Sequence, residues 1–110
     1  MKYTWINARC STLSRLCEHA ADLMNHDDPA DHYAVTDLLQ LVVDNAESLI
    51  TLTEGREGSE YLIDARYLAG AARYLYSPHD GGATNNEAAA VAYQAAGVLQ
   101  CAENEDYYTT

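Results

Sequence analysis

The stretch VTDLLQLVVDNAESLITL, residues 35–52, decides the fold of this chain. When its residues are spaced at about 100° around an axis, the apolar side chains share one broad arc. The members of this arc are Leu38, Leu39, Val42, Ala46, Leu49 and Ile50. A narrow polar strip remains, made of Asp37, Gln40, Asp44, Glu47, Thr51 and Glu54. The pattern predicts a mostly buried helix over about residues 34–53 with one solvent-exposed, acidic edge.

Three other segments have the same helical periodicity, at about residues 5–24, 59–76 and 85–102. Pro78 ends the third segment, and Thr84 and Glu87 have the capping-box spacing at the start of the fourth. The fourth segment is rich in alanine and glycine. It therefore either approaches a neighbouring helix closely or is a weakly held element.

No stretch alternates as a surface strand does, so residues 1–110 are expected to form a single all-α domain. Its architecture is either a small four-helix bundle or a compact irregular helical fold. The final stretch, ENEDYYTT at 103–110, is expected to be a frayed acidic tail.

The composition restricts the partners of the protein. Asp and Glu total 17 against 6 Lys and Arg, which gives a net charge of −11 and a pI near 4.4. Such a charge disfavours direct binding to nucleic acid or anionic membranes and favours a basic protein partner. Three cysteines without a CxxC pair, and no long apolar run, predict a soluble cytoplasmic protein. Nine tyrosines without any phenylalanine are typical of interfaces.

The stretch NHDDPADHY, residues 25–33, is the one concentration of metal-binding side chains. Its donors are His26, Asp27, Asp28, Asp31 and His32. They surround Pro29 between two predicted helices, and no helical HExxH or cysteine-rich spacing accompanies them. We interpret the stretch as a solvated turn in which Asp31 caps the following helix, with a metal-dependent enzyme as the alternative.

Other catalytic patterns are missing from the sequence. It contains no GxSxG and no glycine-rich phosphate loop, and Cys10 and Cys17 lie on an apolar stripe where cysteine is typically a small buried hydrophobe. We therefore predict a protein that is not an enzyme and needs no cofactor.

Two surface features remain as candidate partner-binding sites. The first is the acidic edge of the second helix, formed by Asp37, Asp44, Glu47 and Glu54. Carboxylates spaced one or two helical turns apart resemble part of the row of phosphates along DNA. A protein that normally binds nucleic acid could therefore bind this edge instead. The alternative interpretation of this edge is an ordinary solvent-exposed helix face without a binding role.

The second feature, the tyrosine stripe, lies opposite the core face of the third helix. It contains Ile63, Tyr67, Gly70 and Tyr74. Either this helix is central and buried on both sides, or the stripe is exposed and binds a partner. Arg66 and Arg73 beside it either form a polar rim or pair with acids of the bundle.

Three functional classes follow: an acidic inhibitor or adaptor that binds a protein, a self-associating structural subunit such as a homodimer, and a metal-dependent enzyme. The acidic edge, the Tyr67/Tyr74 stripe and the tail ENEDYY on a short helical chain resemble the small phage- or prophage-encoded inhibitors of bacterial defence, including anti-CRISPR proteins. That resemblance implies binding to a nucleic-acid-handling complex. The protein would either occupy the DNA groove of the complex as a DNA mimic or prevent the complex from assembling.

Overall fold

The computed structural model describes residues 4–25, 31–76, 83–105 and 107. These residues form four helices and no strand. The helices are α1 (Thr4–Met24), α2 (Asp31–Leu52), α3 (Ser59–Leu75) and α4 (Ala83–Glu103). The structure therefore confirms the predicted all-α fold, in its four-helix bundle form.

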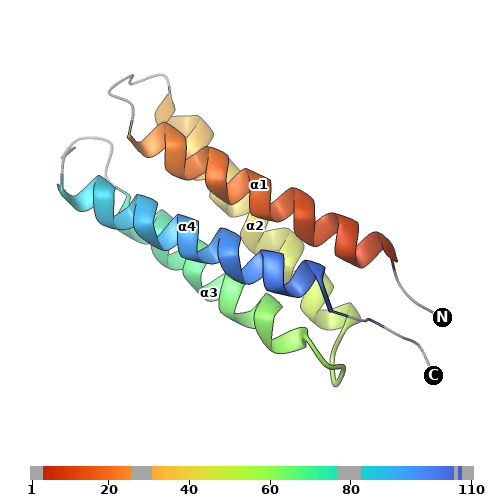
Figure 1. Cartoon of the computed structure of the whole chain (residues 1–110). Helices are drawn as coiled ribbons and strands as arrows, with labels where there is room; N and C mark the ends of the chain where they lie inside the picture. The colour runs from red at the N-terminus through yellow and green to blue at the C-terminus, as the bar shows by residue number, and fades with distance from the viewer. Residues whose placement is uncertain (1–3, 26–30, 77–82, 106, 108–110) are drawn as a thin grey trace.

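The helices run up and down along a common axis (Figure 1). Each packs against its neighbours in sequence, and α4 returns beside α1 to close the ring. The helix ends leave only short connections, which favour antiparallel neighbours. This order makes α2 and α3 adjacent over their length.

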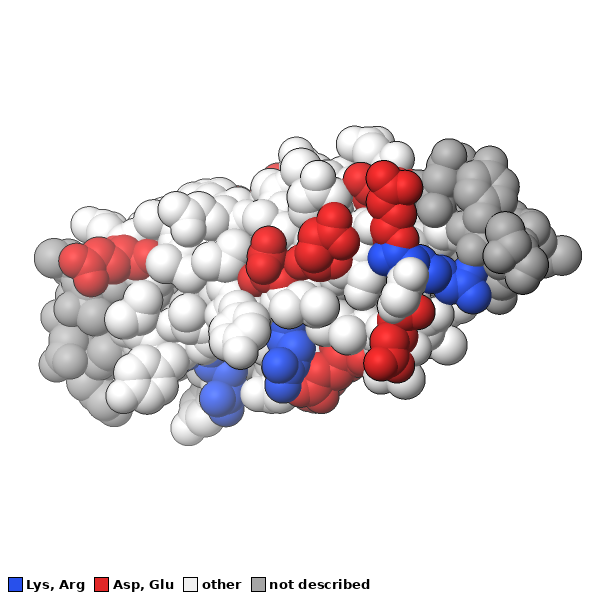
Figure 2. All heavy atoms as spheres, turned by 90° about the horizontal axis from the view of Figure 1, so that it is seen from below, with Lys and Arg blue, Asp and Glu red and all other residues white. Residues whose placement is uncertain are grey.

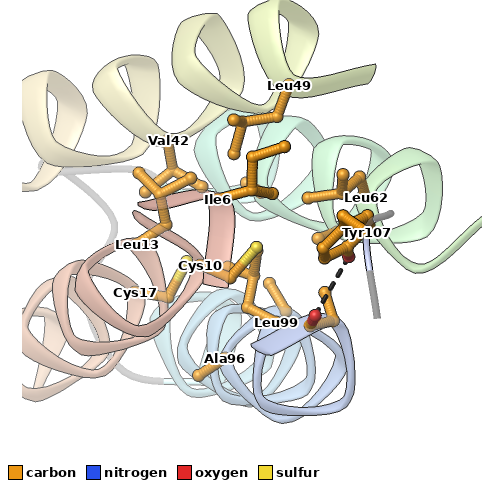
Figure 3. Close-up of a cluster of buried hydrophobic side chains, with 14 residues drawn as sticks. Ile6, Cys10, Leu13, Cys17, Val42, Leu49, Leu62, Ala96, Leu99 and Tyr107 are labelled. Atoms are coloured by element: carbon orange, nitrogen blue, oxygen red, sulfur yellow. Dashed lines mark hydrogen bonds between the residues drawn. The ribbon is translucent and has the colours of Figure 1, made fainter. Parts of the chain in front are cut away.

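Two groups of buried side chains fill the interior. The first, the terminal core, lies at the end where the chain termini are drawn and contains large side chains such as Ile6, Leu13, Leu62 and Leu99 (Figures 1 and 3). The second, the distal core, occupies the other end and consists mainly of alanines. Its members are Ala20, Ala21, Met24, Val35, Leu39, Ala72, Ala88, Ala89 and Ala92.

The alanine-rich α4 packs closely against its neighbours. It contacts both α1 and α3, and its inward alanines, such as Ala88 and Ala92, are fully buried. A buried hydrogen bond also joins it to α1, since the Ser14 hydroxyl donates to the Ala96 carbonyl at 2.9 Å. Of the two alternatives for this helix, the structure shows the close approach.

The prediction that α2 is mostly buried is wrong for its outer side. Leu41 and Leu52 are about half exposed, at 50% and 52%. All six members of the predicted arc are buried or half-buried, but the solvated strip is wider than the sequence pattern indicated, because α2 has helices on only two of its sides. The solvated face of α2 therefore contains leucines as well as carboxylates.

The expected fraying of the tail is also wrong for its described residues. Tyr107 is fully buried in the terminal core, and its hydroxyl donates to the Ala102 carbonyl at 3.0 Å (Figure 3). The Asn7 amide nitrogen donates to the carbonyls of Glu103 at 2.6 Å and Glu105 at 2.7 Å. The chain after α4 is thus attached to the start of α1.

Candidate functional site

The acidic edge and the tyrosine stripe lie side by side, on α2 and α3 respectively. The Glu47 carboxylate on α2 accepts two hydrogen bonds from Arg66 on α3, from Nε at 2.9 Å and from Nη2 at 2.6 Å. Val43 of α2 and Gly70 of α3 line a single hollow. These contacts define a line of contact between the two helices, the α2/α3 seam, with one predicted feature on each side.

All four carboxylates of the acidic edge, from Asp37 to Glu54, are exposed. Asp44 accepts a hydrogen bond from the neutral Gln40 amide at 2.8 Å. Glu47 differs, because its charge is balanced by Arg66 across the seam. Both side chains of this pair are more than 40% exposed, so it adds only about 0–1 kcal/mol to stability.

The paired Glu47 breaks the acidic edge into separate charges. The same mixture is visible from below the view of Figure 1, where basic side chains lie among groups of carboxylates (Figure 2). DNA presents an unbroken series of negative charges. The geometry therefore favours a polar rim of mixed sign over a phosphate-like line.

The tyrosine stripe is exposed, so the alternative in which α3 is central and buried on both sides is wrong. Tyr67 and Tyr74 are 71% and 89% exposed, and Ile63 is 40% exposed. The inward side of α3 is a separate face, formed by Leu62, Ala65, Ala69 and Ala72. The helix is therefore buried on one side only, and two tyrosine rings project from the bundle.

A hollow of about 340 Å³, the Gly70 hollow, opens on the α2/α3 seam. It is lined by Val43, Arg66, Tyr67, Gly70 and Ala71. A Cβ placed on Gly70 would meet no other heavy atom within 4 Å, so the missing side chain leaves open space. Its volume lies at the lower end of the roughly 300–1,000 Å³ typical of ligand pockets. The sequence placed Gly70 in the stripe but did not predict the hollow, since one of its five lining residues, Val43, comes from α2.

A second hollow, of about 250 Å³, lies between α1 and α4 and is polar. Its lining residues are Ser11, Ser14, Arg15, Glu18, Gln100 and Glu103. The Ser14 hydroxyl already donates to a backbone carbonyl, and the Gln100 amide donates to Glu18 at 3.4 Å. The lining contains no histidine or cysteine to activate a nucleophile. This hollow is a polar groove between α1 and α4.

The solvated-turn and metal interpretations of the stretch at 25–33 fall mainly on residues outside those described, 26–30. Its described member His32 packs edge-on against Tyr76, with ring centroids 6.2 Å apart. Within the described part of the chain, no three His, Cys, Asp or Glu side chains are grouped to hold a metal ion.

The three cysteines occupy two environments. Cys10 and Cys17 are buried, and burial raises the pKa of the Cys10 thiol to about 11 and that of Cys17 to about 12. Cys101 is exposed. The two buried thiols are small hydrophobic side chains of the terminal core, as the apolar stripe predicted.

We expect one thiol to react readily with a disulfide reagent such as DTNB in the folded protein near neutral pH. Only Cys101 is accessible, whereas Cys10 and Cys17 stay protonated and out of contact with solvent. Absorbance should report one equivalent before denaturant is added and all three afterwards, and Cys101→Ser should remove the fast phase. Rapid reaction of all three native thiols would contradict the burial of this core.

None of the described helices has the length and apolar character needed to cross a membrane. No protein-family model matches the sequence, and no curated protein or solved structure matches it.

Proposed function

We propose that this protein is a non-catalytic, acidic binding module that contacts a protein partner through the α2/α3 seam. The observation that carries the proposal is the exposure of Tyr67 and Tyr74 beside the open Gly70 hollow. Tyrosine is enriched among the residues that dominate binding energy, because it offers a large contact area at little entropic cost. The polar rim formed by Glu47 and Arg66 fits the usual anatomy of such a site.

The partner proposed is a basic, nucleic-acid-binding protein or complex. A net charge of −11 steers the module toward a positively charged surface, and Glu47 of the acidic edge lies at the seam. Together with the resemblance to anti-defence inhibitors, this supports inhibition by occupying the partner's surface. The mixed charge at Glu47 and Arg66 supports contact through aromatic anchors more than full DNA mimicry.

The proposed place of action is the cytoplasm. Cys10, Cys17 and Cys101 are all free, which fits a compartment that keeps thiols reduced. Targets that handle nucleic acid are found there as well.

We expect the double variant Tyr67→Gln/Tyr74→Gln to lose its partner while remaining folded. Both rings are exposed, so their removal should leave the core intact and weaken binding at least about tenfold, or about 1.4 kcal/mol. The untagged chain is used to capture proteins from bacterial lysate at low and moderate salt, and affinity for the purified partner is then measured by calorimetry.

The matched control is Leu41→Gln/Leu52→Gln, which removes two exposed apolar side chains of α2 that do not line the Gly70 hollow. It should bind as the original chain does. Equal affinity of the tyrosine variant and the original chain would refute this use of the α2/α3 seam.

A further inference from the structure

We infer that the partner places a basic amphipathic helix along the α2/α3 seam, with one apolar side chain seated in the Gly70 hollow. This inference rests on the proposed function and specifies the structural element and chemistry that the seam accepts. It follows from three properties of the seam: the lining of the hollow, the spacing of the stripe and the position of the carboxylates.

The lining of the Gly70 hollow selects an apolar side chain. Val43, Gly70 and Ala71 offer only hydrocarbon or backbone atoms, and Arg66 and Tyr67 complete the lining. Arg66 also lines the hollow, with its guanidinium hydrogen-bonded to Glu47, so a second cation is disfavoured there. Open space extends from the position where a Cβ of residue 70 would lie. The hollow accepts a branched or aromatic side chain from outside.

The spacing along α3 suits a helix. Ile63, Tyr67, Gly70 and Tyr74 follow one another at intervals of four, three and four residues, so they form a ridge about three turns, or roughly 16 Å, long. In this ridge Gly70 is a gap between two tyrosines. A partner helix packed against α3 presents its own side chains at the same intervals. One of these side chains would pack into the gap at Gly70, as in knobs-into-holes packing.

The exposed carboxylates of α2 determine which charge the incoming helix should carry. Asp44 precedes Glu47 by three residues and Asp37 precedes Asp44 by seven, so both lie on the outward face of α2, next to the position of Glu47. Both are exposed, and the described hydrogen-bond partner of Asp44 is a neutral amide. Lysines or arginines seven residues apart on the incoming helix would face both carboxylates while its apolar stripe faces α3. Acidic residues on the side of the incoming helix that faces α2 would be repelled, and the exposed Arg73 of α3 restricts its basic residues to that same side.

The chain offers a matched pair of glycines for the test. Gly70 and Gly97 both lie within helices, and a Cβ at either would meet no other heavy atom within 4 Å. Leucine at either position should therefore be accommodated, and it replaces the poor helix former glycine. Only Gly70→Leu fills the hollow.

The probe is a labelled 18-residue helical peptide of lysine and leucine, with its leucines on one face.

We expect this peptide to bind the original chain and Gly97→Leu equally, and to bind Gly70→Leu at least about tenfold more weakly in fluorescence anisotropy. A scrambled peptide of the same composition and a version with glutamate in place of lysine should bind at least about tenfold more weakly. In NMR titrations, the amides of residues 43 and 66–71 should shift.

Equal binding to Gly70→Leu, or equal binding of the scrambled peptide, would overturn the inference. So would a dimer of the original chain in sedimentation that is lost in Gly70→Leu, because the occupant would then be a second copy. In lysate capture, loss of the partner by Tyr67→Gln/Tyr74→Gln but not by Gly70→Leu would leave the proposed function standing and reject the helix in the hollow. Capture unaffected by either variant would reject both.

Discussion

Replacing Tyr107 with alanine is expected to lower the free energy of unfolding by about 3–5 kcal/mol, as for other large aromatic side chains removed from a core. The ring is fully buried and belongs to the terminal core, although it follows the last helix (Figure 3). Its loss leaves a cavity beside Cys10 and Leu62 that the helices cannot close without shifting. Urea unfolding followed by circular dichroism measures the change.

Two variants separate the contributions at this position. Tyr107→Phe keeps the ring and removes the hydroxyl that donates to the Ala102 carbonyl, so it should cost about 1 kcal/mol. Tyr74→Ala removes an equally large but exposed ring, and should change stability by no more than about 0.5 kcal/mol. If Tyr107→Ala were as mild as Tyr74→Ala, the residue would not be part of the core.

The second large effect is expected from Ala92→Leu in α4. Ala92 is fully buried in the distal core, among alanines of the neighbouring helices. Three added carbon atoms must displace these helices, which should destabilise the protein by about 2–3 kcal/mol. Thermal and urea unfolding give the measurement.

Ala90→Leu is the control on the same helix. Ala90 is exposed, and leucine has nearly the helix propensity of alanine, so this variant should remain within about 0.5 kcal/mol of the original chain. Comparable stability of the two variants would mean that α4 does not pack tightly, contrary to the contacts described above.

The helices were predictable because their signal is local. Apolar residues three and four apart within one segment are enough to define a helix and its inward face, and Pro78 marks an end without reference to the rest of the chain. The error concerns the width of the solvated face of α2: Leu41 and Leu52 lie outside the predicted apolar arc, where no neighbouring helix covers them.

The candidate site was predictable only in separate parts. Periodicity identified both the acidic edge and the tyrosine stripe, but their adjacency depends on how α2 packs on α3. Glu47 and Arg66 are 19 residues apart, and neither residue type specifies its partner. The position of the tail was beyond local reasoning for the same reason, since Asn7 reaches a carbonyl 98 residues further along the chain.

The unequal cores give the binding face one firm end and one adaptable end. An alanine removes much less apolar surface from water than a leucine or a tyrosine, so the distal half of the bundle needs less free energy to open locally than the terminal half. Val43, in the wall of the Gly70 hollow, packs against the terminal core, whereas Leu75, next to Tyr74, packs against the distal core. In the proposed interaction, a partner would therefore meet a preorganised anchor at the hollow and, toward Tyr74, a surface that adjusts to its shape through small opening motions.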